Sequence, residues 1–304
     1  MLIDGVFSGG GIKNFALVGA HQVLEEHGFR FKRVAGTSAG AILACFIAAG
    51  YSSKEIEVLL DEIDFKKLLD PRKTFLPSTV MKWVFLYWRL GLYQGKALEK
   101  WFLEKLAIKG VYCFGDLPEG SLKLIVSDLT NGRMLVLPDD LDKYGIQADT
   151  FPIARALRMS CGLPFFFEPV KLKDAQGEAV LVDGGMLSNF PMWLFDDKDG
   201  NKQRPVLGLK ISHDNGKVSG HKIDNGLDLF EALFSTMQNA HDKKYISRKH
   251  EKNIIFIPVN DTSTTQFDLS DEMRAELIAR GRSSAEHFLK TWKASTNPVY
   301  SMNI

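Results

Sequence analysis

The pentapeptide Gly36-Thr37-Ser38-Ala39-Gly40 gives the chain its best candidate for a nucleophile, because it has the form G-x-S-x-G. It lies between an apolar run typical of a strand and an alanine-rich run typical of a helix. A strand-to-helix turn of this kind exposes the serine hydroxyl beside backbone N–H groups. The motif arises by chance in about one chain in ten of this length, so a tight turn with a helix-capping serine is the alternative.

A glycine turn at residues 8–13 (SGGGIK) precedes the pentapeptide and follows the first apolar run. The N–H groups of Gly9, Gly10 and Gly11 are suited to hold an anion at the start of a helix. Acyl transfer develops a negative oxygen, and preorganised N–H donors typically stabilise it by a few kcal/mol. A dinucleotide site fits less well, because Asn14 replaces its third glycine and no carboxylate ends the next predicted strand. A plain glycine turn is the other alternative.

A serine nucleophile needs a base, and Asp183 is one candidate. It ends a predicted strand over residues 179–182 and is followed by Gly184 and Gly185, which allow a tight turn. Taken alone, a turn aspartate that bonds its own backbone is the simpler explanation. The later histidines fall in predicted loops and helices without a motif around them: His213, His221, His241, His250 and His287.

The elements that must position these residues begin with a βαβα pattern, which predicts a parallel sheet covered by helices. Its strands are expected at residues 2–7 and 31–35 and its helices at 12–27 and 39–49. Residues 53–107 look helical, with a separate helix after Gly95, and Asn131-Gly132 predicts a hairpin between strands at 122–126 and 134–137. Further helices are expected at 153–158, at 227–248 and after Ser270, and further strands at 206–211 and 254–257. Without repeats or linkers, we expect one domain over residues 1–304.

The composition is that of an ordinary globular chain of 304 residues, 45% hydrophobic and 25% charged. Its formal net charge of +1 gives no argument for nucleic acid as a partner. Cys45, Cys113 and Cys161 lack metal-ligand spacing and indicate reduced thiols inside a cell. No secretory leader precedes the glycine turn, and the longest run of small apolar residues is far shorter than the roughly 20 residues of a membrane span. We therefore expect a cytoplasmic protein with at most peripheral membrane contact.

Four segments occur together in a specific order along the chain. They are the glycine loop with its basic residue Lys13, the serine pentapeptide, the segment 158–169 (RMSCGLPFFFEP) with Pro164, and the Asp183-Gly184-Gly185 turn. In this order they resemble the patatin-like phospholipase family. The resemblance covers most of the chain and implies a three-layer α/β/α fold with a mostly parallel central sheet.

The same resemblance implies a Ser–Asp dyad that works without a catalytic histidine, a cofactor or a metal. Ser38 is then the nucleophile and Asp183 its base, while Gly9, Gly10 and Gly11 form the oxyanion hole. Supporting roles fall to Lys13, Gly36, Gly40, Gly184, Gly185 and Pro164. The implied substrate is a lipid acyl ester, and the alternatives are acyl transfer on the same dyad or a catalytically silent lipid-binding protein. Family members often have glycine at the position of Asn14, so the loop's outer wall should differ here.

The run from Val80 to Tyr93 is dense in large apolar side chains, and Trp83, Phe85, Tyr87 and Trp88 are candidates for peripheral membrane contact. Tryptophan and tyrosine favour the interface between lipid and water. Apolar residues occur almost all round this predicted helix, which favours burial in the core instead. The sequence does not indicate an oligomeric state.

Overall fold

The computed structural model describes residues 1–63, 65–72, 78–174, 177–196, 204–213, 223–224, 226–245, 251–259 and 270–292. Within these residues an eight-stranded sheet has the order β10-β9-β1-β2-β4-β8-β7, with β5 paired to β4 off this path. Its strands are β1 (Leu2–Phe7), β2 (Arg30–Thr37), β4 (Leu122–Asp128), β5 (Arg133–Leu137), β7 (Val170–Asp174), β8 (Gly177–Asp183), β9 (Val206–His213) and β10 (Ile254–Val259).

The central part of the sheet is parallel, as the βαβα pattern predicts. Strand β1 pairs in parallel with β2 and β9, β2 pairs in parallel with β4, and β9 pairs in parallel with β10. Only the β4 side of the sheet is antiparallel, where β5 and β8 pair with β4 and β7 pairs with β8. The β4–β5 hairpin turns at Asn131-Gly132, which confirms the predicted turn.

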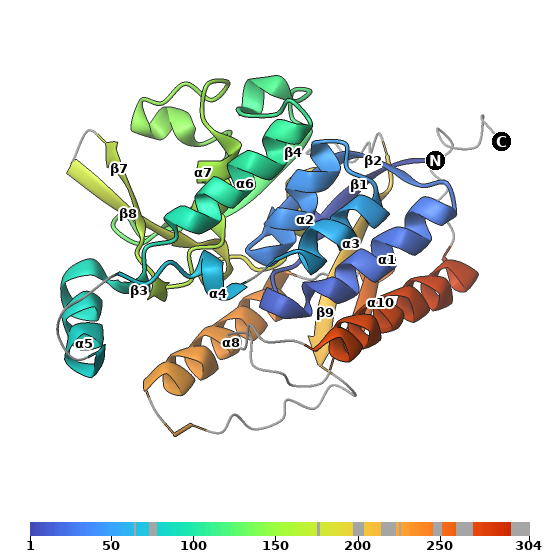
Figure 1. Cartoon of the computed structure of the whole chain (residues 1–304). Coiled ribbons are helices and arrows are strands. Elements are labelled where there is room, and N and C mark those ends of the chain that lie inside the picture. The colour runs from blue at the N-terminus through green and yellow to red at the C-terminus, as the bar shows by residue number, and fades with distance from the viewer. Residues whose placement is uncertain are drawn as a thin grey trace.

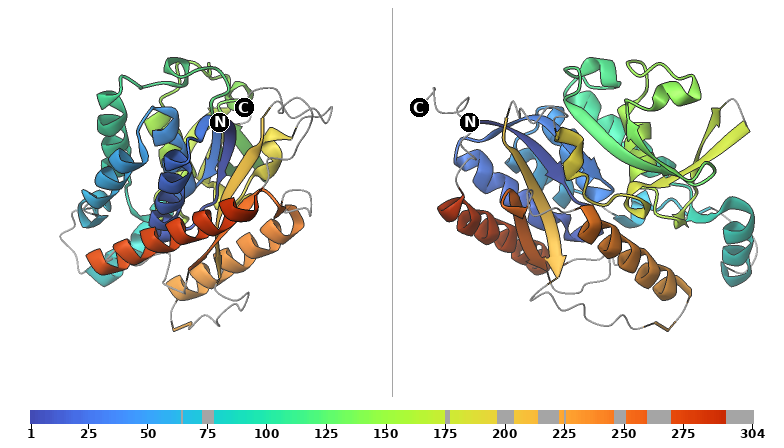
Figure 2. Two further views of the ribbon diagram at one scale, coloured as in Figure 1. Left: turned by 90° about the vertical axis from the view of Figure 1, so that its right-hand side faces the viewer. Right: turned by 180° about the vertical axis from the view of Figure 1, so that it is seen from behind.

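Helices flank this sheet (Figures 1 and 2), so the mixed α/β fold expected from the sequence is confirmed. In Figure 1 the helices α1, α2, α3 and α10 cover the face toward the viewer. On the opposite face, a smaller cluster joins Val6 of β1 and Ala35 of β2 to a short 3₁₀ helix, η5. The α-helices are α1 (Phe15–Glu26), α2 (Ala39–Ala48), α3 (Ser53–Asp61), α4 (Phe65–Leu68), α5 (Ser78–Arg89), α6 (Lys96–Ile108), α7 (Ile153–Ser160), α8 (Gly226–Tyr245) and α10 (Asp271–Thr291). The 3₁₀ helices are η1 (Gly11–Asn14), η2 (Phe114–Asp116), η3 (Leu141–Tyr144), η4 (Gly184–Met186) and η5 (Met192–Phe195).

The expectation that residues 53–107 are helical is wrong at residues 91–93. A short strand β3 (Gly91–Tyr93) follows α5 and pairs in parallel with β6 (Phe165–Phe167), which the sequence also did not reveal. The buried guanidinium of Arg158 joins the segments that follow the two strands by donating to the main-chain oxygens of Gly95 and Glu168, at 3.0 and 2.6 Å. A tertiary contact of this kind overrides local helix propensity.

Helix α5 also contradicts the expectation of burial for its aromatic residues. The side chains of Tyr87 and Trp88 are each 75% exposed, with their ring centroids 5.1 Å apart, whereas Phe85 is half-buried. The side chain of Trp83 lies outside the described part of the structure. Figure 1 shows α5 at one side of the molecule, joined to the rest through β3.

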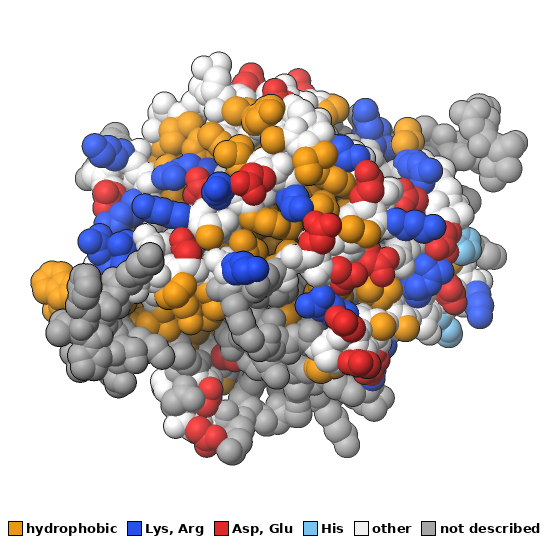
Figure 3. All heavy atoms as spheres, in the orientation of Figure 1, with side chains coloured by type: hydrophobic (Ala, Val, Ile, Leu, Met, Phe, Trp, Pro, Cys, Tyr) orange, Lys and Arg blue, Asp and Glu red, His pale blue; other side chains and the backbone are white. Residues whose placement is uncertain are grey.

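Figure 3 shows acidic and basic side chains interspersed over one face, as the net charge of +1 suggests. Among the described helices, none combines the length and the apolar character that a bilayer crossing requires. The expectation of a single domain stays a prediction.

Helix α1, which follows the glycine loop, packs closely against α10 through a pair of glycines. A Cβ atom added at Gly19 would lie 2.1 Å from the main-chain oxygen of Ile278, and one added at Gly281 would lie 1.8 Å from that of Ala16. Backbone therefore meets backbone at this crossing, and a methyl group does not fit without moving a helix. The crossing fixes the helix that carries the glycine loop at its N-terminus.

We expect Gly281→Ala to lower the free energy of unfolding by about 2 kcal/mol, because the added methyl group overpacks the crossing. Urea denaturation at unchanged m-value measures this loss. Gly226→Ala is the matched control, since no atom of the described residues lies within 4 Å of a Cβ added at Gly226. Equal denaturation midpoints for the two variants would contradict the close crossing.

Candidate active site

The turn around Ser38 has the strained geometry that an exposed nucleophile requires. Ser38 lies between the end of β2 and the start of α2 with φ 55° and ψ −129°, a conformation that non-glycine residues rarely adopt. Backbone approaches closely on both sides. A Cβ atom on Gly36 would lie 2.3 Å from the oxygen of Gly40, and one on Gly40 would lie 2.4 Å from the oxygen of Ser8. The turn therefore needs glycine at both ends of the pentapeptide.

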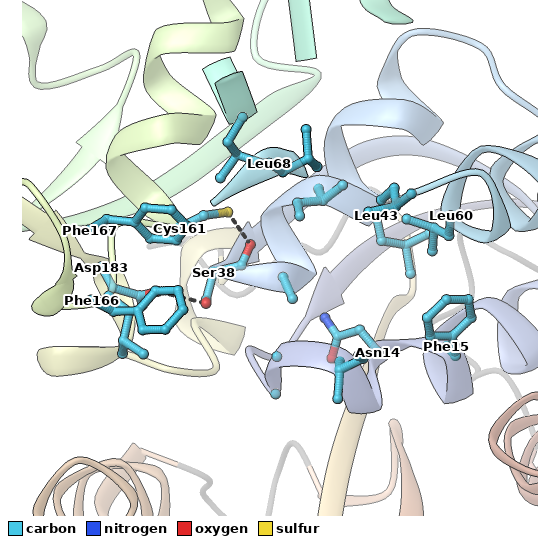
Figure 4. Close-up of a pocket in the computed structure, with 18 of the residues that line it drawn as sticks. Asn14, Phe15, Ser38, Leu43, Leu60, Leu68, Cys161, Phe166, Phe167 and Asp183 are labelled. Atoms are coloured by element: carbon cyan, nitrogen blue, oxygen red, sulfur yellow. Dashed lines mark hydrogen bonds between the residues drawn. The ribbon is translucent and has the colours of Figure 1, made fainter. Parts of the chain in front are cut away.

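Strand register brings Ser38 and Asp183 to the same level of the sheet. Thr37 of β2 pairs with Ile125 of β4, and Asp183 of β8 pairs with Val126 of β4. Across β4, the Oγ of Ser38 donates a hydrogen bond of 2.7 Å to Oδ2 of Asp183 (Figure 4). The predicted nucleophile and the predicted base are therefore in direct contact.

Asp183 is buried, with 1% of its surface exposed, and the surrounding groups determine its charge. Burial raises the pKa of its carboxyl from 3.8 to about 7, because an ionised carboxylate loses its hydration. Two donors oppose this rise, the Ser38 hydroxyl and the Gly185 N–H, which lies 2.7 Å from Oδ1. The carboxyl thus has the proton affinity of a general base that works near neutral pH.

The glycine loop enters the site from the end of β1, the strand next to β2. Gly10 and Gly11 line the same cavity as Ser38, at the N-terminus of η1, where the first N–H groups have no partner within the helix. Gly11 has φ +56°, which favours glycine. The N–H of Gly9 instead donates to the main-chain oxygen of Asn189 at 3.2 Å, so this structure does not present Gly9 as an oxyanion donor.

Lys13 and Asn14 complete η1, and both side chains are largely buried, each 7% exposed. Asn14 lines the cavity (Figure 4), and its Nδ2 donates to the oxygen of Ser8 at 3.4 Å. Its Oδ1 has no hydrogen-bond partner among the described residues. Asn14 therefore forms a polar wall beside the glycine loop, as its departure from the family pattern suggested.

The segment 158–169 supplies residues that position Ser38, a role that the sequence did not predict. The N–H of Ser38 donates to Oγ of Ser160 at 3.2 Å, and that hydroxyl donates to the oxygen of Ile125 at 2.7 Å. The thiol of Cys161 donates to the main-chain oxygen of Ser38 at 3.2 Å (Figure 4). Pro164 is buried in the turn that leads into β6. The motif located this segment, but only the fold shows which of its atoms reach Ser38.

A cavity runs from the dyad along one face of α2 toward α3. The space between its lining atoms, its open mouth included, is about 1190 Å³. The wall away from Ser38 is apolar, with side chains from α1, α2, α3 and α6 and from the residues around α4: Phe15, Val18, Ile42, Leu43, Phe46, Ile56, Leu60, Ile63, Leu68, Leu69 and Leu98. From Ser38 to Phe46 the helix rises by about 12 Å. This shape suits an extended apolar chain attached to a group at Ser38.

Histidines take no part in the described site. Among the described residues that line the cavity there is no histidine, and the Ser38 hydroxyl is bonded to Asp183. His221 and His250, and the side chain of His213, lie outside the described part. The described residues also include no group of three or more His, Cys, Asp and Glu side chains that could hold a metal ion.

Comparison with known proteins gives relatives that cover between 68% and 96% of this chain. The uncharacterized protein YqhO of Bacillus subtilis is 56% identical over 292 residues, which cover 96% of this chain and 99% of that protein. Triacylglycerol lipase ptl3 of Schizosaccharomyces pombe is 26% identical over 68% of this chain and 41% of its own length. The crystal structure of VipD from Legionella pneumophila has the same fold, with a TM-score of 0.57 at 20% identity over 95% of this chain and 67% of that one.

The family model for patatin-like phospholipases matches residues 5–196, a span that includes the glycine loop, the Ser38 turn, the segment around Pro164 and Asp183. The chain therefore belongs to the patatin-like phospholipase family.

Proposed function

We propose that this protein is a lipid acyl hydrolase that cleaves carboxylic esters with Ser38 and Asp183. The observation that carries the proposal is the 2.7 Å hydrogen bond between these side chains at the head of an apolar cavity. A related chain, ptl3 of Schizosaccharomyces pombe, is a triacylglycerol lipase, which supports a lipid substrate. We also propose a cytoplasmic location, from the sparse cysteines of the sequence.

In the acylation step, the Asp183 carboxylate removes the Ser38 proton while Oγ attacks the ester carbonyl carbon. The carbonyl oxygen becomes negative in the tetrahedral intermediate. The N–H groups of Gly10 and Gly11 are placed to stabilise it, each of them contributing about 3 kcal/mol if typical of such donors. Asp183 then gives its proton to the leaving alcohol, and an ester of Ser38 remains.

In the deacylation step, water takes the place of the departed alcohol. Asp183 removes a proton from the water, the hydroxide oxygen attacks the Ser38 ester, and the same N–H groups stabilise the second intermediate. Collapse of this intermediate returns the proton to Ser38 and releases a fatty acid. Acyl transfer differs only in that another alcohol replaces this water, and it is the second candidate because the dyad serves both reactions.

The apolar wall of the cavity accounts for the choice of substrate. Each methylene group that enters it gains about 0.8 kcal/mol from leaving water. The chain also displaces water from the buried dyad, where a low dielectric strengthens the interaction between Asp183 and the Ser38 proton. An acyl chain therefore contributes to binding and to the conditions under which a carboxylate can act as base.

We further propose that α5 contacts the membrane surface that holds the substrate. Besides Tyr87 and Trp88, the exposed apolar residues here include Leu90 at 42% and Phe165 at 46%. Strand β3 links α5 to β6, and Phe166 and Phe167 of β6 line the cavity. Tyr87 and Trp88 thus lie on a helix that is joined through β3 to a strand whose residues line the cavity.

Ser38→Ala should abolish the release of fatty acid from phospholipid, lysophospholipid and triacylglycerol vesicles, because no other nucleophile replaces the hydroxyl. Asp183→Asn should reduce kcat by at least 10³-fold, roughly as loss of a general base and its proton transfers does. Release is measured by titration of fatty acid against wild type, with and without glycerol as an added acyl acceptor. Wild-type turnover by Asp183→Asn would refute the dyad, and glyceride ester formed at the expense of fatty acid would favour the transferase.

The pH dependence should follow the raised pKa of Asp183. Since the ionised carboxylate is the base, kcat/KM should rise about tenfold per pH unit below pH 7 and level off above it.

The raised pKa of Asp183 also makes the stability of the fold depend on pH, because the folded protein favours the protonated carboxyl. The contribution of this proton to the free energy of unfolding is complete below pH 3.8 and is lost as pH rises through 7. In urea denaturation, the free energy of unfolding of Asp183→Asn relative to that of wild type should therefore increase by a few kcal/mol between pH 4 and pH 8. A constant difference would contradict the buried carboxyl.

Replacing both Tyr87 and Trp88 by serine should weaken binding to phospholipid vesicles at least tenfold, because two exposed aromatic groups no longer enter the interface. The Ser38→Ala background keeps the vesicles intact during sedimentation assays. Hydrolysis of a short, water-soluble ester by the corresponding active variant should stay unchanged. Tyr112→Ser is the matched control, since Tyr112 is 50% exposed and follows the far end of α6. Equal vesicle binding by both variants would exclude α5 as the contact.

A further inference from the structure

A buried ion pair lies outside the described lining of the cavity. The ammonium group of Lys210 on β9 bonds to Oδ2 of Asp242 on α8, and their side chains are only 12% and 7% exposed. Removing two charges from water is costly, so a buried ion pair is weak evidence for stability. Its remaining contacts show what the pair can contribute instead.

The side chain of Asn189 is fixed at both ends by α8. Its Nδ2 donates to Oδ2 of Asp242 at 3.3 Å, and its Oδ1 accepts a hydrogen bond of 3.2 Å from Nε2 of Gln238. Gln238 and Asp242 are four residues apart, so they lie on the same face of the helix. With one donor and one acceptor in place, the amide of Asn189 has a single favourable orientation.

Asn189 in turn contacts the glycine loop through main chain and side chain. Its main-chain oxygen accepts the N–H of Gly9 at 3.2 Å, and its Oδ1 lies 2.4 Å from where a Cβ on Gly9 would be. The preceding residue, Ser188, accepts a hydrogen bond of 2.9 Å from Oγ1 of Thr37, next to the nucleophile. The segment 188–189 therefore joins the two halves of the site.

We infer that Lys210, Asp242 and Asn189 are positioning residues, which hold the glycine loop so that the N–H groups of Gly10 and Gly11 face the oxyanion. This inference rests on the proposed function. Asp242 orients Asn189, Asn189 holds Gly9, and Gly9 precedes the two donors in the chain. A displacement of about 1 Å in such a donor lowers catalysis by roughly 10²-fold.

Kinetics on a short, water-soluble p-nitrophenyl ester test the inference. Asp242→Ala should lower kcat at least tenfold with KM within twofold, because the donors act mainly on the transition state. The pH midpoint near 7 should stay unchanged, since Asp183 is untouched. Asp228→Ala is the matched control, an aspartate of the same helix 14 residues earlier, or about 21 Å along the axis. It should keep wild-type kcat.

A double variant separates positioning from stability. Lys210→Met with Asp242→Leu removes both charges and fills the space, which should return the urea midpoint toward that of wild type. The Nδ2 of Asn189 still lacks its acceptor, so kcat should stay at least tenfold low. Recovery of kcat together with stability would overturn the inference and leave the pair a purely structural role.

Hydrogen exchange of the segment 8–14 gives a readout that does not need catalysis. Asp242→Ala and the double variant should speed exchange of the Gly9 amide at least tenfold, and Asp228→Ala should not. Unchanged exchange would overturn the inference even if activity falls. If wild type and Ser38→Ala are equally inactive on every ester, the proposed function fails, and exchange alone still decides whether this network holds the loop.

Discussion

The hydrogen bond between Ser38 and Asp183 depends on the register of three strands. β4 lies between β2 and β8, with Ile125 beside Thr37 and Val126 beside Asp183. A slip of one residue in either pairing would move the two side chains apart by about 3.3 Å along the strand. It would also exchange the faces on which side chains point. The sheet therefore brings the two motifs together, and the core that fixes this register also determines the contact between Ser38 and Asp183.

Much of the polar network around the dyad is directed at peptide groups. Ser160 and Cys161 bond the N–H and the oxygen of Ser38, and Asn189 bonds the N–H of Gly9. Such contacts hold the strained turn and the glycine loop without competing for the reacting hydroxyl. Helix α8 takes part on one side through Asp242, which orients Asn189. A strained backbone conformation persists where several neighbouring groups hold it in place, and these hydrogen bonds do so for Ser38 and the glycine loop.

The sequence predicted the parts of the site whose chemistry is local. The Ser38 turn, the glycine loop and the turn after Asp183 each need particular residues at short spacing, and the βαβα order placed two of them at one sheet edge. The pairing of β3 with β6 was missed because each strand has three residues and Gly91 meets Phe165 far along the chain. Lys210, Asp242 and Asn189 were missed for the same reason, since they meet only through tertiary packing. The apolar pattern of α5 did not distinguish burial from exposure, because apolar residues occur almost all round the helix.

In the proposed cycle a carboxylate takes the place of imidazole as the base, and burial raises the pKa of Asp183 to about 7, which suits that role. The same burial limits how water and alcohols reach the dyad. In the proposed cycle, the acyl chain stays under α2 and α3, where the wall is apolar. The amide side chains of Asn14 and Gln238 also line the described cavity, and both lie near the glycine loop. In the proposed cycle this polar part of the lining faces the leaving alcohol and the incoming water, while the apolar wall holds the acyl ester of Ser38 in place between the two steps.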